Sequence, residues 1–445
     1  MDAAVDTYLS TFAELEQAAA SRGPTWVHGI RTQAIARFAE LGFPSTRLED
    51  WRYTNVTPIT KVRFLPARAD HRNGLSADWL DQATLGGLAG SRLVLVDGQF
   101  RPELSSLEVL PCGVHVSSLA AAIETDGDFI EARLARFARD DESGFLALNT
   151  AFLEDGAFLR IPPGTVVERP IHVVYVSTAP GDPTVSHPRT LIVAEDGCQA
   201  TILESYVSLG TGTHLTNAVT ELVAGPSAVV EHIKLALQAE SVFHVATLSV
   251  YQERASNVVL HSFSLSNGLV RNDVTVVLDG EGSECTLNGL FVGNGHAHVD
   301  NHTTIDHVKP RCSSQELYKG ILGGKSSGVF NGRIRVRPNA QKTSARQTNK
   351  NLLLSPGAQI NTKPQLEISA DDVKCYHGST IGQLDADALF YLRARGIDKD
   401  AARALLTQAF ASEMMDRLRC EPLRRRFEAL VLTRLPARAD TEESP

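Results

Sequence analysis

The chain has 445 residues, 43% of them hydrophobic and 21% charged, which is ordinary globular composition with room for several domains or one long solenoid. Its net charge of −9 and its 6% aromatic content provide no basic stripe and no base-stacking platform, so we expect no nucleic-acid partner. No signal-peptide pattern opens the chain and no apolar run approaches the roughly 18 residues of a membrane span, so we expect a cytoplasmic protein without membrane contact.

The first of three compositional zones is an N-terminal helical and mixed region over residues 1–145. An apolar stripe through Val5 and Phe12 predicts one helix, and a second opens at Pro24 and ends at Gly42. The apolar run at 93–96, followed by a turn at 97–98, predicts a strand, and short helices are expected within 117–138.

The second zone, residues 146–383, is rich in short Val, Ile, Thr and Leu runs that are punctuated by a recurring turn. Successive turn centres are separated by 33, 30, 29, 27, 28 and 28 residues. They are Gly164, Gly197, Ser227, Ser256, Ser283, Arg311 and Asn339. A period near 30 without a helical pattern is typical of a parallel β-solenoid, although an antiparallel sandwich can imitate it. In a solenoid, Cys198 and Cys312 would occupy equivalent, buried positions.

The third zone, residues 384–445, is predicted to be helical. Gly396 fits the end of one helix, Asp398 fits the N-cap of the next, and a third helix is expected after Pro422. The six cysteines contain no Cys-x-x-Cys pair and are expected to be reduced thiols.

A histidine-rich run covers residues 296–307. If it is a strand, the even positions share one face while Val299 and Ile305 point the other way, so His296, His298 and His302 are weaker candidate metal ligands. The alternative is a polar strand surface whose histidines hydrogen-bond along the ladder, and the spacing alone favours this interpretation.

Residues 320–326, Gly-Ile-Leu-Gly-Gly-Lys-Ser, imitate a phosphate-binding P-loop. The pattern requires glycine at position 319, which is Lys319, and a helix after Ser326, where turn and strand residues follow instead. We therefore expect no nucleotide to bind to this chain.

The most informative pair is Cys375 and His377. If residues 373–377 are extended, the two side chains share a face, where both could meet iron or zinc. A tetrahedral site needs about four ligands, so any metal would need others from elsewhere in the fold or from a second chain.

Several motifs together resemble the SufB/SufD family of iron-sulfur cluster assembly proteins. They are Asp300-Asn301-His302, Tyr318-Lys319-Gly320-Ile321-Leu322, Val329-Phe330-Asn331-Gly332, Ala340-Gln341-Lys342-Thr343, Asn351-Leu352-Leu353-Leu354-Ser355, Thr362-Lys363-Pro364-Gln365-Leu366-Glu367-Ile368 and the run 371–396. Within the family, residues 372–378 and 389–396, with Glu49-Asp50-Trp51-Arg52-Tyr53-Thr54, resemble the SufD branch more than the SufB branch.

The resemblance implies a mainly β fold, a right-handed parallel β-helix flanked by N-terminal and C-terminal helical regions. It also implies a non-ATPase subunit of a scaffold complex with SufB and two copies of the ATPase SufC. SufB would pair with the far end of the β-helix, and SufC would dock on residues 384–419. By motif position, Cys375 and His377 would contribute to a transient iron-sulfur cluster shared with SufB.

Two other functions stay open. The chain could be a purely structural adaptor in which Cys375 and His377 only pack at an interface, or a β-helix enzyme acting on saccharides or acyl groups. The isolated chain could also pair with itself, because a surface meant for a paralogue can accept its own copy.

Overall fold

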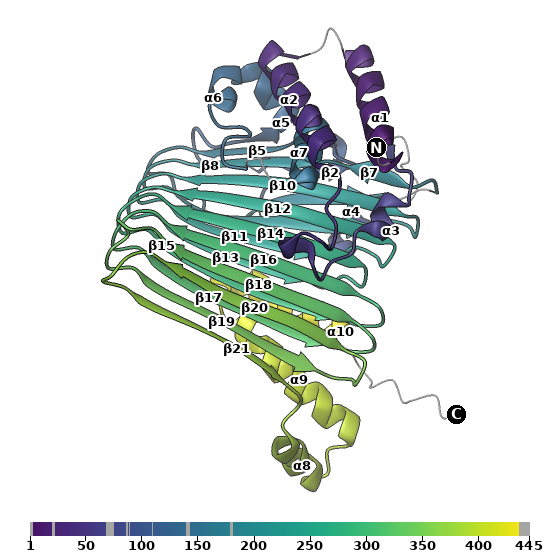
Figure 1. Cartoon of the computed structure of the whole chain (residues 1–445), viewed down its shortest axis with the longest axis vertical. Coiled ribbons are helices and arrows are strands. Elements are labelled where there is room, and N and C mark those ends of the chain that lie inside the picture. Colours follow the sequence, from purple (N-terminus) through teal and green to yellow (C-terminus); the bar gives the residue numbers. More distant parts are fainter. Residues whose placement is uncertain are drawn as a thin grey trace.

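The computed structural model describes residues 3–19, 23–67, 75–85, 88, 90–108, 110–138, 143–178 and 181–435. Its body is a solenoid in which the chain alternates between two sheets, so that each strand pairs with the strand one full turn later (Figure 1). Almost all of these pairs are parallel, which confirms the predicted parallel solenoid and excludes the antiparallel sandwich.

We call the two faces sheet A and sheet B. In spatial order, sheet A contains β20 (Gln359–Ile368), β18 (Ser327–Val336), β16 (His298–His307), β14 (Leu269–Leu278), β12 (Val242–Gln252), β10 (His214–Ala224), β8 (Arg189–Ala194), β5 (Gly156–Ile161) and β4 (His115–Ser118), with β7 (Thr184–Ser186) and β1 (Leu65–Pro66) beside it. Sheet B contains β21 (Lys374–Gly382), β19 (Ser344–Leu353), β17 (Ser313–Leu322), β15 (Glu284–Gly293), β13 (Asn257–Ser264), β11 (Val229–Ala236), β9 (Gln199–Ser208), β6 (Ile171–Ser177), β2 (Arg92–Val96) and β3 (Gln99–Phe100).

The recurring turn forms one corner of the solenoid. One residue in each of seven successive turns adopts positive φ, namely Gly164, Gly197, Ser227, Ala255, Gly282, Arg311 and Lys342. The amide of each donates to a carbonyl of the next turn, for example Ser227 to Arg254. The residue after the corner is buried in six of these turns, and Cys198 and Cys312 both occupy this position, as predicted.

Side chains alternate between the interior of the solenoid and its outer surface. On sheet B, Leu260 and Leu287 stack in register inside, whereas Ile233 and Phe263 point outward to a second layer. Because the strands are parallel and in register, each interior position repeats as a column that runs along the solenoid.

The N-terminal end of the solenoid is covered (Figure 1). The helices over it are α1 (Ala3–Ala19), α2 (Thr25–Leu41), α5 (Leu119–Thr125), α6 (Gly127–Glu131) and α7 (Gly144–Ala151), with α4 (Ala77–Ala83) nearby. Aromatic rings join α1, α2 and the following loop, with Tyr8, Phe38 and Phe43 in edge-to-face contact. Both predicted helices are present, and Gly42 caps the second as expected.

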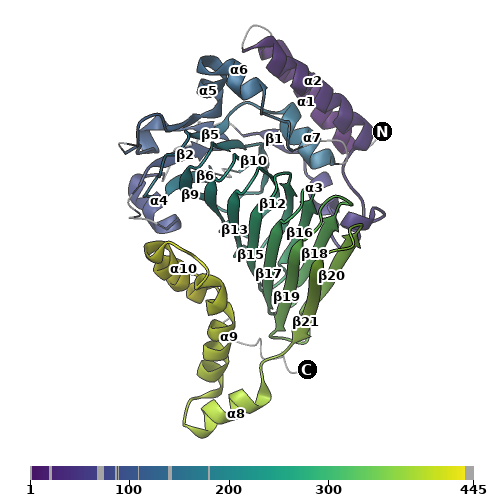
Figure 2. The ribbon, with the colours of Figure 1, turned by 90° about the vertical axis from the view of Figure 1, so that its left-hand side faces the viewer.

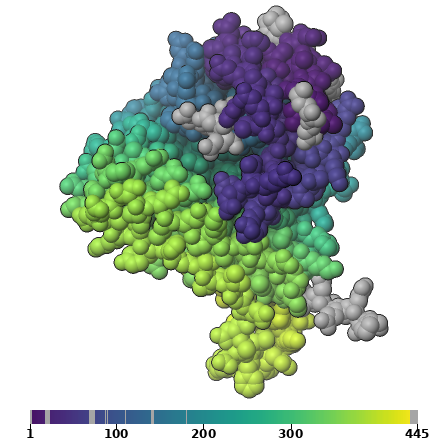
Figure 3. All heavy atoms as spheres, in the orientation of Figure 1, coloured from purple at the N-terminus to yellow at the C-terminus, as the bar shows by residue number. Residues whose placement is uncertain are grey.

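Residues 43–64 then lie along the outer face of sheet A (Figure 3). This segment contains the short helices η1 (Glu49–Trp51) and α3 (Thr57–Thr60), and η2 (Pro102–Leu104) follows later in the chain. Trp51 stacks on Phe145 and lies under the guanidinium of Arg271 from β14. The segment is thereby fixed to strands far along the solenoid.

The C-terminal chain forms α8 (Ala386–Ala394), α9 (Lys399–Met415) and α10 (Glu421–Arg434), with the predicted caps at Gly396 and Asp398. Figure 2 shows α9 and α10 running back along the outer face of sheet B, whereas α8 projects beyond the last strand. The side-chain amine of Lys319 donates to the Phe410 carbonyl and pairs with Glu413, and Phe427 packs on Phe263. No helix in the described ranges is long and apolar enough to span a membrane.

The predicted region boundaries at 145/146 and 383/384 stay a prediction. Strands β2, β3 and β4, all from the predicted N-terminal region, join the sheets of the solenoid. Residues 436–445 of the predicted C-terminal region lie outside the described part of the chain.

Candidate functional site

The C-terminal end of the solenoid is formed by the two last strands, β20 and β21. Each is the terminal strand of its sheet, and among the described residues each is paired along one edge only, β20 with β18 and β21 with β19. Their residues are half-buried or exposed, unlike those of the strands before them. The solenoid therefore ends in two open edges next to each other.

Cys375 and His377 lie on β21, which is extended and directs both side chains toward the interior side of the sheet. Their partners on β19 are Ala345 and Gln347, each 1% exposed. Cys375 is half-buried and packs against an apolar group that contains Ile334. His377 is exposed because no further turn of the solenoid covers it.

The two side chains offer one sulfur and one nitrogen donor. Burial raises the pKa of the Cys375 thiol, so the thiol keeps its proton near neutrality unless a metal or a base displaces it. No group of three or more His, Cys, Asp or Glu side chains in the described ranges could hold a metal ion. Cys375 and His377 offer two donors, fewer than the roughly four of a tetrahedral metal site.

The three weaker candidate ligands, His296, His298 and His302, do not form a metal site together. His296 lies in the turn before β16, so it does not share the strand face with the other two histidines. The ring nitrogens of His298 contact Thr54 Oγ1 at 2.8 Å and Ser327 Oγ at 2.7 Å, and His302 Nε2 lies 3.2 Å from Asp300. This strand face holds the segment that contains Thr54, as expected for a polar, hydrogen-bonded strand surface.

Asp300 is the centre of that attachment. Burial would raise the pKa of its carboxyl, but Arg271 and His302 outweigh burial and hold it well below its usual range. Arg271 Nη1 donates to Asp300 at 2.6 Å and to the Asp50 carbonyl at 2.8 Å. The Glu49-to-Thr54 motif therefore has a structural role, because Asp50 and Thr54 attach this segment to the buried pair of Arg271 and Asp300.

The P-loop-like segment is the link between β17 and β18. Gly324, with φ 61°, and Lys325 form its turn, and β18 begins at Ser327. The predicted turn and strand are confirmed, so the segment lacks the helix N-terminus that aims amides at a phosphate.

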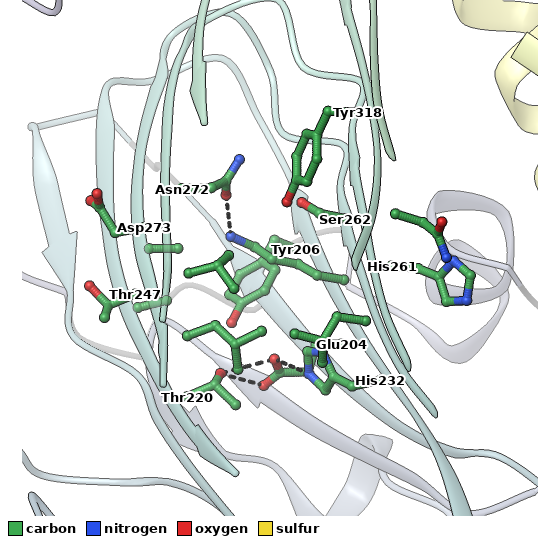
Figure 4. Close-up of a pocket in the computed structure, with 17 residues that line it drawn as sticks. Glu204, Tyr206, Thr220, His232, Thr247, His261, Ser262, Asn272, Asp273 and Tyr318 are labelled. Carbon is green, nitrogen blue, oxygen red and sulfur yellow. Dashed lines mark hydrogen bonds and ion pairs between the residues drawn. The ribbon is translucent and has the colours of Figure 1, made fainter. Parts of the chain in front are cut away.

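Sequence reasoning missed a set of polar side chains inside the solenoid (Figure 4). Glu204 accepts from Thr190 and Thr220 and lies 2.9 Å from His232 Nε2, and Lys234 Nζ donates to Asn272 at 2.6 Å. Burial lowers the pKa of Lys234 to about 7. A cavity of about 20 Å³, which is room for a water molecule, is lined by Glu204, Thr220, His232, Lys234 and Asn272 among others.

Fold and site together define a parallel β-solenoid that is open at one end, where its last strand presents one thiol and one imidazole. Two family models match the chain. The SufBD protein N-terminal region matches residues 2–173, and the core domain of SufBD proteins from the SUF system of FeS cluster assembly matches residues 175–410. The chain belongs to this SufBD family of iron-sulfur cluster assembly.

Individual relatives agree with this assignment. The chain is 33% identical to an iron-sulfur cluster assembly SufBD family protein of Synechocystis, covering 91% of this chain and 90% of the relative. It is 31% identical to the iron-sulfur cluster assembly protein SufD of Escherichia coli, covering 92% and 93%. Identity to SufD of Bacillus subtilis is 26%, covering 95% and 96%.

Proposed function

We propose that the chain is a SufD-type subunit of a scaffold complex in which it shares a nascent iron-sulfur cluster with a SufB-type partner. The observation that carries the proposal is the placement of Cys375 and His377 together on an open terminal strand. The cluster is the cargo of the complex, so the site need only hold it in part and release it. Similarity to SufD of E. coli and of B. subtilis supports the branch.

The open edges suit a second solenoid. A terminal strand presents unpaired backbone donors and acceptors that favour pairing with another chain. Tyr376 is 65% exposed and Ile381 51% exposed on β21, and Ile368 is 41% exposed at the end of β20. A SufB-type solenoid that pairs edge to edge would cover these side chains and bring its own ligands to His377. In isolation, the same edges can accept a second copy of this chain.

The C-terminal helices suit a different partner. Phe390 and Tyr391 on α8 are 74% and 55% exposed, and Leu405 on α9 is 46% exposed, although all three are large and apolar or aromatic. Such side chains gathered on a projecting element mark a docking surface. We assign it to a SufC-type ATPase, in which we place the ATP hydrolysis of the complex.

The donor chemistry suits the cargo. Thiolate binds iron readily, and an imidazole can replace a thiolate on one iron of a cluster. Free thiols also fit the cytoplasm that we propose as the location, because disulfides rarely persist there, and Cys375 is among the unpaired cysteines.

The test is co-expression of the chain with SufB-type and SufC-type partners, anaerobic purification, and iron and sulfide analysis. We expect His377→Ala and Cys375→Ala to assemble the complex with at least a severalfold lower cluster content. Ser379→Ala is the matched control, because Ser379 is the next interior-side residue of β21 but offers no metal donor of comparable strength. Equal cluster content in the wild type, both variants and the control would contradict the proposal.

One observation favours a purely structural adaptor instead. Cys375 packs with the side chains around Ile334 and Ala345, as an interface residue without a metal role would. In an adaptor, Cys375→Ala would weaken complex assembly and leave the cluster content per assembled complex unchanged. Measuring the yield of complex and its iron content separately distinguishes the two functions.

A further inference from the structure

One interior column of sheet B runs directly to His377. Its last four members are in register on consecutive strands, namely Leu287, Glu316, Gln347 and His377. Strands in a sheet lie about 4.8 Å apart, so each side chain in the column can reach the next. Beyond Leu287 the column is polar up to the open end.

Glu316 is the first polar member of the column after Leu287. It is 3% exposed, and its Oε2 accepts a hydrogen bond of 2.7 Å from Gln347 Nε2. Burial raises the pKa of this carboxyl to about 7. A buried carboxyl is costly, and here its hydrogen bond fixes the neighbouring amide.

Gln347 is held on two sides. Its Nε2 is bound by Glu316, and the amide lies against Gly332 of sheet A, where an added Cβ would come within 2.3 Å of Nε2. The other end of the amide, Oε1, is buried and finds no hydrogen-bond partner among the described residues. A fixed acceptor without a donor therefore lies one strand away from an exposed imidazole.

We propose that Gln347, held by Glu316, positions the imidazole of His377 by accepting its ring N–H. Accepting from one ring nitrogen fixes the tautomer and leaves the lone pair of the other nitrogen available to a metal. Metal-binding histidines commonly have such a partner for their second nitrogen. This inference rests on the proposed function for its purpose, but the hydrogen bond forms when the exposed imidazole turns toward Gln347 Oε1, which needs neither a metal nor a partner chain.

Cys375 lacks an equivalent support. Its neighbour on β19 is Ala345, and the next residue along that column is Ser314. The column thus orients the imidazole of His377 by a hydrogen bond, whereas the thiol of Cys375 is oriented by packing alone.

The experiment uses the full chain with ¹⁵N-labelled histidine rings and measures the tautomer ratio of neutral His377 by NMR at pH 8. The His377 signals are assigned from the spectrum of His377→Ala. Replacing the acceptor with Gln347→Leu is expected to change the ratio by roughly two- to tenfold, which corresponds to the net strength of one hydrogen bond. The exchanged pair, Glu316→Gln with Gln347→Glu, restores an acceptor at position 347 and should restore a strong bias.

Ser379→Ala is the control, since Ser379 is also on the interior side of β21 and bonds to Thr362 and Asn349 outside the column. The tautomer ratio of His377 in the Ser379→Ala variant should equal that in the wild type. Gln347→Met, which keeps the length of the side chain, replaces Gln347→Leu if the latter does not fold. An unchanged ratio in a folded Gln347 variant, or a ratio that Ser379→Ala changes equally, would overturn the inference.

This readout needs neither iron nor partners, so it is independent of the proposed function. If Gln347 variants change the tautomer ratio but His377→Ala leaves the cluster content of the complex intact, the positioning stands and the cluster role fails. If the cluster content depends on His377 but Gln347 variants leave the tautomer ratio of His377 unchanged, only the positioning role of Gln347 is contradicted.

Discussion

At the scale of single residues, the solenoid interior combines apolar columns with buried charge. A strand that alternates polar and apolar residues predicts polar side chains on the solvent face. On sheet B the outer face is instead covered by helices, so both faces of several strands are buried, and Glu204, Lys234 and Glu316 point inward. The sequence offered only an indirect signal for these residues: Gly289 and Gly332, whose missing side chains leave room for Tyr318 and Gln347.

Glu316 makes stability depend on pH. Its pKa of about 7 in the folded chain lies above the roughly 4.3 of an unfolded glutamate, so the folded state favours the protonated form. The contribution of this carboxyl to the free energy of unfolding is therefore fully present below about pH 4.3. It is lost as the pH rises from there through about 7. Glu316→Gln should be more stable than the wild type at pH 8 by an amount on the order of 3 kcal/mol, and similar to it near pH 4.5.

Denaturant unfolding at the two pH values measures this difference. Glu281→Gln is the matched control, since the Glu281 side chain is 50% exposed, and its effect should be small at both pH values. A Glu316→Gln variant with the same stability as the wild type at pH 8 would show that the carboxyl ionises without hindrance in the folded chain.

At the scale of elements, the turns and helix ends were predictable because each depends on local chemistry. The turns at the recurring corner and the caps at Gly42, Gly396 and Asp398 follow from a few residues each, whereas positive φ at Ser227, Ala255, Arg311 and Lys342 was not predictable from these residue types. The apolar residues of α9 could be identified in the sequence, but the sequence did not show which of them are buried and which are exposed. Met414 is buried against sheet B, whereas Leu405 is 46% exposed, because the helix borders the solenoid on one side only.

The docking of α10 on sheet B should depend on Phe427. This side chain is 0% exposed and its ring centre lies 4.6 Å from that of Phe263. Phe427→Ala should lower the free energy of opening of α10 by about 3–5 kcal/mol, which amide hydrogen exchange measures. Leu432→Ala on the same helix is the control, since Leu432 is 45% exposed and should change the exchange little. Equal effects of both variants would mean that α10 is not held by this contact.

At the scale of the whole molecule, the two ends of the solenoid differ. Helices and the antiparallel pair of β4 and β5 finish the N-terminal end, whereas β20 and β21 leave the other end open (Figure 2). The periodicity predicted the solenoid, and the apolar stripes with their helix-end residues predicted the flanking helices. Neither could show that residues 43–64 lie on sheet A, because that contact depends on pairs such as Thr54 with Asp300 and Glu49 with Lys363, which are far apart in sequence.

Of the candidate site, the part that depends on neighbouring residues was predictable, and the part that depends on residues far apart in sequence was not. Strand alternation was enough to place Cys375 and His377 on one face of β21. The column behind His377 was not predictable, since the register of β17, β19 and β21 depends on the length of each solenoid turn. That length varies along the chain, with Ser313 paired to Ser344 and Ser344 to Lys374.

The central claim, that His377 of this chain contacts the nascent cluster, is tested most directly by the nuclear hyperfine coupling of its nitrogen. The complex is assembled from this chain labelled with ¹⁵N-histidine and from unlabelled partners, loaded with cluster, and reduced to a paramagnetic state for pulsed electron paramagnetic resonance. We predict a ¹⁵N coupling to the cluster that is present in the wild type and in Ser379→Ala and absent in His377→Ala. A fully loaded wild-type complex without ¹⁵N coupling would contradict the account.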